Sequence, residues 1–330
     1  MIIQDSIYGK ITITDPLILK IINTPAFQRL KRVNQYGGVN FVYPDKYQTT
    51  RFDHSIGVWW ILKTLGTNQE TQIAGLLHDI GHTAFSHMVD MAMALKTEDY
   101  HEKNLHRIPG INEIYDILKS NSIILKSLDD YGEIKRNMPN VGADRVDYAV
   151  RDYFAATGIR SELGKRVLNN ITLKGDQIVF KNLSIAREYS LAGLDAMWLV
   201  IYEPSVAIVY SSLINIIRLG MIEQKWLSED DLYLDDITLL NKIMEHKSEI
   251  PDTDIRVFTA KFKVKKATSD DFDFHHVKKR SRYFDPFVIV ENGVKKLSEI
   301  DKDFEKTMKK MVEKFDKGKE GEYYKVQFLD

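Results

Sequence analysis

Apolar residues near the N-terminus first alternate with polar residues or glycine and then change to a helical spacing. The alternation from Ile7 to Ile13 predicts a short strand or hairpin. From Pro16 onward the isoleucines within Ile18–Ile22 fall on one face of a helix. Asp15 suits the N-cap of this helix, and proline suits its first position. The chain therefore begins with a small β element followed by a helix.

Helical spacing dominates the next two hundred residues, with one predicted hairpin between helices. The segments at helical spacing are His54–Leu65, the run Thr71–Leu77 and the histidine-rich segment after it, Asp144–Tyr153 and Glu188–Gly220. The predicted hairpin joins Ile171–Leu173 to Gln177–Phe180 around Gly175-Asp176. The most apolar stretch, Leu191–Tyr210, contains Asp195, Glu203 and Pro204, so we expect a buried helix pair there and not a membrane span.

The pattern changes near Pro251. Apolar residues within Val257–Val264 alternate with lysines, and Phe287–Val290 is strand-like. An amphipathic helix over Phe304–Phe315 and a strand over Tyr323–Phe328 follow. The chain of 330 residues exceeds what one compact core usually holds. We therefore predict a mainly α fold with a helical core over residues 1–250 and a small α+β C-terminal lobe over residues 251–330.

Composition limits the chemistry that the chain can carry. Hydrophobic residues make up 44% and charged residues 28%, as in soluble globular proteins. The formal net charge of -1 gives no bulk attraction to nucleic acid or membrane, so we expect neither as a partner. The chain has no cysteine, which excludes disulfides and thiolate metal sites. No secretory signal precedes the first helix, and we expect a cytoplasmic protein.

Histidines gather in one short segment. Composition alone predicts about 0.3 histidines in a window of ten, yet residues 78–87 contain His78, His82 and His87. His78 and His82 are four apart, so on a helix they share a face, and Asp79 lies beside them. A single histidine on an apolar helix is usually a hydrogen-bonded core residue. Several titratable groups within one apolar stretch are costly to bury without a shared ligand.

A metal ion is the ligand that best fits this cluster. Imidazoles and carboxylates without sulfur suit Zn, Fe, Mn, Ni or Co, and Mg where enough water ligands join them. A divalent metal ion of this kind lowers the pKa of bound water and polarises a phosphoryl oxygen. The residues therefore favour metal-assisted hydrolysis, with the metal identity left open.

Several motifs occur in an order that resembles the HD-domain superfamily. More narrowly, the chain is similar to the SAM- and HD-domain deoxynucleoside triphosphate triphosphohydrolase branch, although no SAM domain is found. The motifs are Ile7–Gly9, Thr24–Leu30, Gln35–Gly38, Arg51–Val58, Leu76–His87, His101-Glu102, Asp144–Tyr148 and, near the C-terminus, Arg282–Pro286. The resemblance is strong over residues 1 to about 160 and looser beyond.

The resemblance assigns a role to each matching residue. It places the metal ligands at His54, His78, Asp79 and Asp144, with two of them on one helix. It places proton-transfer histidines at His82, His87 and His101, of which His101 is the candidate general acid. It places substrate-binding side chains at Gln35, Arg51, Arg145, Tyr148 and Asp152. Arg51 suits a phosphate because a guanidinium donates two parallel hydrogen bonds.

Two departures from the family pattern concern the substrate. Tyr36 stands where the family has a smaller aliphatic residue beside Gln35. The segment Met197–Tyr210, which carries an arginine for the triphosphate in the family, contains none here. The resemblance thus implies hydrolysis of a dNTP to deoxynucleoside and triphosphate. Nucleoside mono- or diphosphates, or another phosphate ester, remain an alternative, and so does a non-catalytic nucleotide-binding protein. The family also implies a homo-oligomer.

Overall fold

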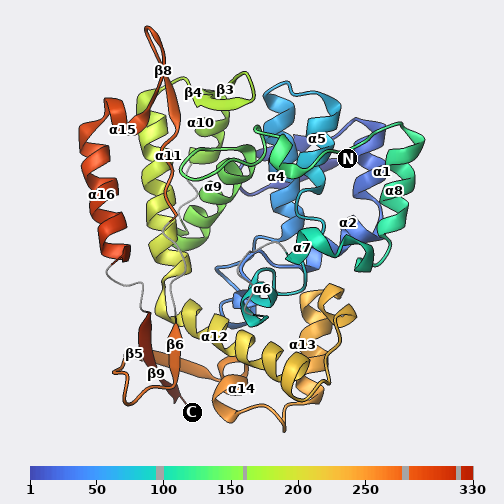
Figure 1. Cartoon of the computed structure of the whole chain (residues 1–330), viewed down its shortest axis with the longest axis vertical. Helices are drawn as coiled ribbons and strands as arrows, with labels where there is room; N and C mark the ends of the chain where they lie inside the picture. The colour runs from blue at the N-terminus through green and yellow to red at the C-terminus, as the bar shows by residue number, and fades with distance from the viewer. Residues whose placement is uncertain (94–99, 159–161, 277–281, 317–320, 330) are drawn as a thin grey trace.

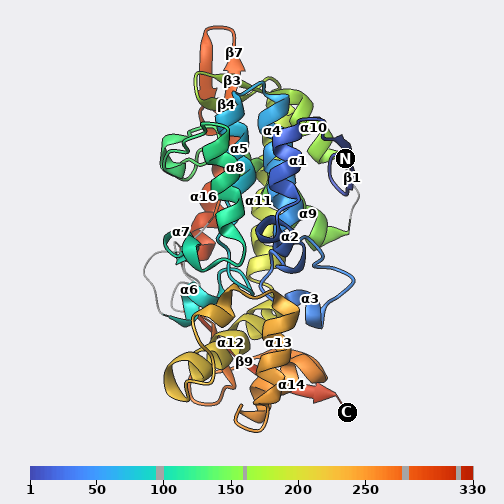
Figure 2. The same ribbon diagram turned by 90° about the vertical axis from the view of Figure 1, so that its right-hand side faces the viewer.

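The structure is a computed structural model of the whole chain. It describes residues 1–93, 100–158, 162–276, 282–316 and 321–329, without the side chains of His101, Glu102 and Ile201. The described part is mainly helical with small sheets, which confirms the predicted fold class. Most of the longer helices form an upper body, and a smaller assembly of helices and strands closes the lower end of the elongated molecule (Figures 1 and 2).

The upper body begins with the predicted hairpin and helix. Strand β1 (Ile2–Asp5) pairs antiparallel with β2 (Gly9–Thr12), and α1 (Pro16–Ile22) follows. Asp15 caps α1 by accepting the N–H groups of Leu17 and Ile18, as the sequence predicts. The other elements up to residue 130 are α2 (Pro25–Arg29), η1 (Leu30–Arg32), α3 (Val39–Val42), α4 (Arg51–Thr64), α5 (Gln69–Leu77), α6 (Met88–Ala92), α7 (Tyr100–Lys103), η2 (Leu105–Arg107), α8 (Ile111–Ser120) and η3 (Leu128–Asp130).

A long central helix and its neighbours complete this body. They are α9 (Ala143–Thr157), α10 (Leu163–Asn170), α11 (Leu183–Ala196) and the π-helix η4 (Met197–Ile201). Between α10 and α11 lies the predicted hairpin of β3 (Ile171–Lys174) and β4 (Gln177–Phe180). Pro204 ends the run of helix, since α12 (Pro204–Arg218) starts there with Glu203 as its N-cap. Proline at the first position needs no N–H donor, so it begins a helix without cost.

The lower end is built around α12. The π-helix η5 (Leu219–Glu223), η6 (Asp230–Tyr233), α13 (Asp236–Glu245) and α14 (Asp252–Thr259) lie beside it, with an antiparallel sheet in the order β5-β9-β6. The strands are β5 (Lys261–Lys266), β6 (Phe274–His276) and β9 (Glu322–Leu329). The predicted alternation from Val257 is wrong at its start, because Val257 is a buried residue of α14. Only Phe262 and Val264 belong to the strand.

The remaining C-terminal elements return to the upper body (Figure 1). Strand β7 (Phe287–Val290) pairs parallel with β4 and antiparallel with β8 (Gly293–Lys296), and α15 (Leu297–Ile300) and α16 (Lys302–Asp316) follow. Strands from both sides of residue 250 thus share the sheet β3-β4-β7-β8. The division into domains at residues 1–250 and 251–330 stays a prediction.

One described helical stretch, Pro204–Glu223, is long and apolar enough to cross a membrane by length and composition alone. In its most apolar window 56% of the residues are buried within the molecule. Val206, Ile208 and Leu213 on this helix lie in the main hydrophobic core. A core helix passes the same length test, and the packing agrees with the expected buried helix pair.

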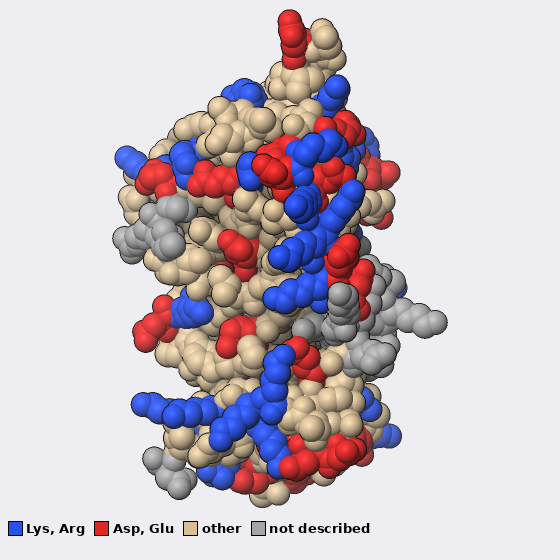
Figure 3. Space-filling model, turned by 90° about the vertical axis from the view of Figure 1, so that its left-hand side faces the viewer, with Lys and Arg blue, Asp and Glu red and all other residues tan. Residues whose placement is uncertain are grey.

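Surface charge is mixed on the face that carries α16. Figure 3 shows Lys and Arg side chains interleaved with Asp and Glu over this side of the molecule. Glu305 accepts ion pairs from both Lys302 and Lys309 on the exposed face of the helix. Exposed pairs of this kind contribute about 0–1 kcal/mol each and are typical of a solvated helix face. The expectation that nucleic acid is not a partner stays a prediction.

Candidate metal centre

The first candidate ligand comes from the start of α4. Thr50 and Asp53 form a reciprocal capping box, in which each side chain accepts the backbone N–H of the other residue. This cap fixes the first turn of the helix, so Arg51 and His54 have defined directions. Both side chains are buried, with 5% and 1% of their surface exposed. Ser55 is the other buried polar residue of α4, and the remaining buried residues are apolar or glycine.

The second candidate ligand lies at the end of α5. This helix ends at Leu77, His78 is its C-cap, and residues 79–87 form turns. The expectation that His78, Asp79 and His82 share one helix is therefore wrong. Arg29 holds the turns after the helix, because its guanidinium donates to the carbonyl oxygens of Ile80 (3.1 Å) and His82 (2.7 Å). These carbonyls are satisfied outside a helix, so the chain is free to turn.

The third element is α9, which packs against α4 and supplies Asp144 in its first turn. An acidic residue at this position is favoured by the partial positive charge of a helix N-terminus. Tyr148 and Asp152 follow at intervals of four residues, so they lie on the same helix face as Asp144. One face of α9 thus carries a candidate metal ligand and two candidate substrate contacts.

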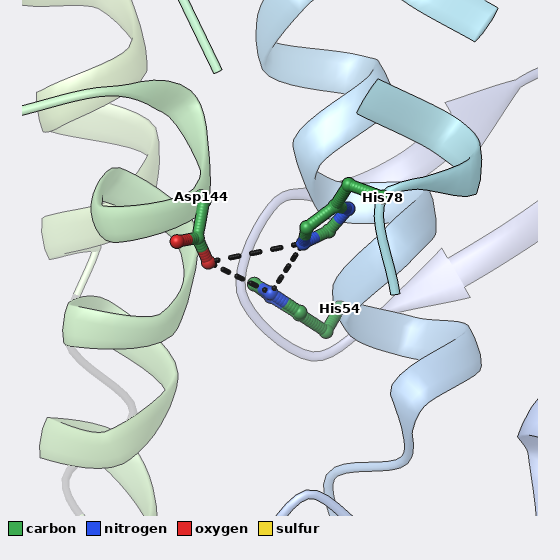
Figure 4. A group of neighbouring side chains, drawn as sticks. All are labelled: His54, His78 and Asp144. Carbon is green, nitrogen blue, oxygen red and sulfur yellow. Dashed lines mark hydrogen bonds and ion pairs between the residues drawn. The ribbon is translucent and has the colours of Figure 1, made fainter. Parts of the chain in front are cut away.

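The candidate ligand atoms converge on one point (Figure 4). His54 Nε2 lies 3.2 Å from His78 Nε2 and 3.2 Å from Asp144 Oδ1. All three ligand atoms lie within 4.8 Å of one another. Asp79 is close by, with Oδ1 3.4 Å from His78 Nε2 and Oδ2 3.6 Å from His54 Nε2. Zn–N and Zn–O bonds of about 2.0–2.2 Å fit between atoms at these separations.

The tautomers of the two histidines show that a cation belongs at this point. His54 Nδ1 lies 2.7 Å from a carboxylate oxygen of Asp147, and His78 Nδ1 lies 2.8 Å from the carbonyl oxygen of Gly75. Both acceptors require a proton on Nδ1, which leaves the lone pairs on Nε2. In neutral imidazoles two such lone pairs only 3.2 Å apart, beside two carboxylates, repel unless a proton or a metal ion lies between them. The donor set therefore fits a divalent metal ion.

The pKa values of His54 and Asp144 indicate that the surroundings of the site favour a positive charge. Burial opposes a charge on His54, but hydrogen bonds with Asp144 and Asp147 outweigh it and raise the pKa of the imidazole to about 10. Burial likewise opposes ionisation of Asp144, yet His54 and His78 hold the pKa of its carboxyl well below the usual range. A proton and a metal ion thus compete for the same nitrogen, and both carboxylates are available as anions.

Arg51 is hydrogen-bonded to one of the candidate metal ligands. It donates from Nη1 to Asp79 at 2.6 Å and from Nε to Ser86 at 3.0 Å. Against the effect of burial, His78 and Arg51 hold the pKa of Asp79 well below its usual range. The guanidinium therefore fixes the Asp79 carboxylate beside the histidines. It has five N–H donors, so these two bonds leave others for a substrate phosphate.

The predicted proton-transfer histidines lie beside this centre where the structure describes them. His82 Nε2 lies 3.3 Å from Asp79 Oδ1, and the His82 and His87 rings are 4.7 Å apart at nearly a right angle. His87 is the N-cap of α6 and lies 3.5 Å from Asp90. The backbone of His101 belongs to α7, but its side chain lies outside the described residues.

The predicted substrate-binding residues come from two parts of the fold. Arg145 donates to the carbonyl oxygen of Asn140 at 2.6 Å, and the ring of Tyr148 packs against Phe284 at 5.8 Å. Burial raises the pKa of Asp152 to about 6, with the phenol of Tyr36 nearby. Gln35 lies in the turn before α3, and its Oε1 is buried without a partner among the described residues.

Four residues around His54 were not predicted from the sequence: Asp5, Gly57, Asp147 and Arg151. Asp147 contacts the His54 ring directly, and Arg151 and Asp5 lie behind it. A signal existed for two of them, because Asp147 and Arg151 are opposite charges four residues apart on a helix. Asp5 gave no such signal, since nothing in a hairpin residue indicates a partner 146 positions away.

Comparison with known proteins places this arrangement in a family. Residues 51–148 match the HD domain family. YdhJ, an uncharacterized protein of Bacillus subtilis, is 30% identical over an alignment of 332 positions that covers 99% of this chain and 99% of that protein. A solved structure of a Bacteroides thetaiotaomicron phosphohydrolase has a TM-score of 0.67 at 19% identity, with 100% of both chains covered, and therefore shares the fold.

Characterised relatives match smaller parts of the chain. The metal-dependent phosphohydrolase cns2 of Cordyceps militaris is 29% identical over 174 residues, or 52% of this chain and 50% of that protein. The human deoxynucleoside triphosphate triphosphohydrolase SAMHD1 is 41% identical over 104 residues, or 27% of this chain and 16% of that protein. The chain thus spans about half the length of cns2 and a smaller part of SAMHD1.

Proposed function

Because the chain belongs to the HD-domain family of phosphohydrolases, we propose that it is a metal-dependent phosphohydrolase. The proposed metal ligands are His54, His78, Asp79 and Asp144. The observation that carries the proposal is the pair of Nε2 atoms 3.2 Å apart beside the Asp144 carboxylate. Zn, Fe, Mn, Ni, Co and Mg all remain candidates for the metal.

The chain's own residues supply what the reaction needs besides the metal. When bound, a divalent metal acts as a Lewis acid that acidifies water and withdraws charge from a phosphoryl oxygen. Arg51 is held beside the ligands by Asp79 and Ser86, and its other N–H groups can donate to the substrate phosphate. Its fixed direction means that the phosphate is oriented as it binds.

Protonation of the leaving oxygen is assigned to a histidine. A leaving alkoxide is a strong base, so its departure needs a positioned proton donor. We assign this role to His101, with His82 and His87 as proton-transfer partners beside the centre. Replacement of His101 by alanine should preserve metal binding and lower turnover by roughly 10²–10⁴-fold. The loss should shrink for a nitrophenyl phosphate ester, whose leaving group is already acidic. An equal loss on both substrates contradicts the assignment.

The proposed substrate is a dNTP, hydrolysed to deoxynucleoside and triphosphate. The support is the similarity of part of the chain to human SAMHD1, together with the positions of Tyr148 and Asp152 on the helix face of Asp144. The missing arginine in Met197–Tyr210 favours the alternative, a nucleoside mono- or diphosphate or another phosphate ester. A triphosphate carries more negative charge and needs more cationic donors than a monophosphate does.

Arg282 offers a replacement for that arginine. Its backbone N–H donates to Met197 Sδ at 3.1 Å, so the C-terminal segment docks on η4. Burial raises the pKa of Tyr148 to about 12 and that of Asp152 to about 6, and the positive charge of Arg282 acts against both rises. The Arg282 guanidinium is thus close enough to interact with a substrate bound beside Tyr148 and Asp152 on α9. This keeps the dNTP proposal ahead of the alternative.

Product analysis tests the proposal. The purified protein is incubated with dNTPs, nucleoside mono- and diphosphates and several divalent metals, and the phosphate product is identified. Free triphosphate supports the dNTP proposal, and inorganic phosphate supports the alternative. No turnover with any metal contradicts the enzyme proposal and leaves a nucleotide-binding protein. The His78→Ala variant is the control, because any activity that it retains in full does not come from this site.

Self-association and location are further proposals that rest on the family resemblance. We propose a homo-oligomer in the cytoplasm, although the stoichiometry is not fixed by any described contact. Light scattering coupled to size-exclusion chromatography measures the mass in solution. A mass of 38.2 kDa at all concentrations, equal to the single chain, contradicts self-association.

A further inference from the structure

A continuous chain of buried hydrogen bonds runs away from the metal centre behind His54. His54 Nδ1 donates to Asp147 Oδ2 at 2.7 Å, and the same oxygen accepts Arg151 Nε–H at 2.6 Å. Asp147 and Arg151 are 0% and 1% exposed. The partner of His54 Nδ1 and the guanidinium behind it are therefore charged, desolvated and held in one direction, which makes their bonds strong.

This series of hydrogen bonds ends in the N-terminal hairpin. Arg151 Nη2 donates to Asp5 Oδ2 at 2.7 Å. Asp5 Oδ1 accepts the N–H groups of Ile7 and Tyr8, each at 2.8 Å, in the turn between β1 and β2. The ring of Tyr8 covers the guanidinium at 5.7 Å. Oδ1 of Asp5 thus stabilises the turn, and Oδ2 binds Arg151.

The close packing of α4 on α9 restricts the side chains in this series of hydrogen bonds. Gly57 lies one turn after His54, and a Cβ there would come within 1.9 Å of Asp147 Oδ1 and 2.5 Å of Arg151 Nη2. The glycine therefore lets the two helices approach at the height of the ion pair. The buried group of Asp5, Asp147 and Arg151 holds two carboxylates and one guanidinium. Its excess negative charge favours a cation at His54.

We propose that Asp5 is a positioning residue of the metal centre, acting on His54 through Arg151 and Asp147. The N-terminal hairpin is then part of the metal site, although it contributes no ligand. Hydrogen bonds to the second nitrogen of a metal-bound imidazole fix its tautomer and its orientation and increase its basicity. Asp5 fixes the direction of Arg151, and Arg151 fixes the carboxylate that receives the His54 proton. This inference rests on the proposed metal function of the site.

The decisive experiment compares Asp5→Asn with Asp15→Asn by Mn²⁺ titration calorimetry on the full chain. Asp15 is a matched control, because it also accepts two backbone N–H groups near the N-terminus but has no bond to Arg151. Direct contacts to metal ligands change affinity by about 10–100-fold, so a residue one step further should change it by roughly 3–10-fold. We expect this loss in Asp5→Asn and less than about a twofold change in Asp15→Asn.

Two outcomes overturn the inference. One is wild-type Mn²⁺ affinity in Asp5→Asn, and the other is an equal loss in Asp15→Asn, which would mean that affinity follows general stability. If Asp5→Asn does not fold, Arg151→Lys gives the same test, because lysine cannot bond Asp147 and Asp5 through a rigid fork. Wild-type affinity in Arg151→Lys also overturns it.

A measurement without metal separates this inference from the proposed function. The Nδ1 proton of His54 lies in a short bond to a carboxylate, so its NMR resonance should be far downfield in the metal-free protein. The resonance should shift in Asp5→Asn and stay in place in Asp15→Asn. An unchanged resonance in Asp5→Asn overturns the positioning role. A wild-type protein that binds no Mn²⁺ contradicts the metal function instead.

Discussion

Buried aspartates occur in two kinds of surroundings in this protein. Around His54 each one lies beside a cation: Asp79 bonds Arg51, and Asp147 bonds Arg151. Asp152 on the substrate side and Asp254 in α14 are also buried or half-buried, but have no ion pair among the described residues. The first two carboxyls have pKa values below the usual range despite burial. In Asp152 and Asp254 burial raises the pKa to about 6.

The difference shows that burial alone does not decide the charge of a carboxyl group. Desolvation favours the neutral form in all four aspartates, and only a nearby cation reverses the result. The carboxylates at the metal centre are therefore anions before any metal binds, which suits ligands and their supporting groups. Asp152 ionises close to neutral pH, which suits a group that forms hydrogen bonds with a substrate and not with a metal.

The largest expected effect distinguishes Asp144 from Asp152, which lie two turns apart on α9. Asp144→Ala removes a ligand, so bound metal should fall and activity should drop by at least about 100-fold, since the metal contributes several kcal/mol. Asp152→Ala removes one hydrogen bond to the substrate, so KM should rise about tenfold with little change in kcat. Elemental analysis and steady-state kinetics measure both variants.

The metal content of Asp152→Ala is the control in this comparison. It should equal that of the wild type, because Asp152 makes no hydrogen bond or ion pair with His54, His78 or Asp144 among the described residues. Loss of metal from Asp152→Ala would place this residue at the metal centre. Full metal content in Asp144→Ala would remove Asp144 from the ligand set.

Much of the fold was predictable because local patterns determine it. The cap at Asp15, the hairpin at Gly175-Asp176 and the break at Pro204 each follow from the chemistry of the residues involved. The cluster of His54, His78, Asp79 and Asp144 was predictable only through the family resemblance. Spacing alone placed His78 and His82 on one helix, and the structure ends that helix at Leu77.

The parts that sequence reasoning missed depend on contacts between distant segments. The turns after Leu77 are held by Arg29, which donates to the carbonyls of Ile80 and His82 about fifty positions away in the chain. The bond from Arg151 to Asp5 joins residues 146 positions apart. Neither pairing leaves a periodic signal, since periodicity reports the face of one element and not its partner. Geometry in three dimensions was needed for both.

The second prediction compares the stabilities of Asp147→Asn and Asp254→Asn without metal. Asp147→Asn breaks a buried ion pair, and removal of one partner of such a pair costs about 3–5 kcal/mol. Asp254→Asn should not destabilise the fold at pH 7, because its amide oxygen still accepts the N–H of Asn215. Chemical unfolding with a chelator present measures both. Equal destabilisation of the two variants would contradict the division between paired and unpaired carboxylates.

The smallest effect is the contribution of Asp254 to the pH dependence of stability. Burial raises the pKa of its carboxyl from 3.8 to about 6 in the folded protein, against hydrogen bonds from Asn215 and Ser212. Between these two pH values the folded state binds a proton that the unfolded state has lost, so stability falls as pH rises through this interval. The full change is about 2–3 kcal/mol, at roughly 1.36 kcal/mol per unit.

Asp254→Asn removes this titration and should therefore gain stability relative to the wild type as the pH rises from 4 to 7. Unfolding midpoints of both proteins at pH 4.5, 5.5 and 7 measure the difference, which should level off above the folded pKa of about 6. Asp15→Asn is the control, since Asp15 caps a helix near the surface and should show no such rise. A constant difference between Asp254→Asn and the wild type would mean that Asp254 is ionised throughout. A buried carboxylate that stays charged must have its charge compensated by its neighbours. The distinction between buried aspartates with and without a neighbouring cation would then rest on Asp152 alone.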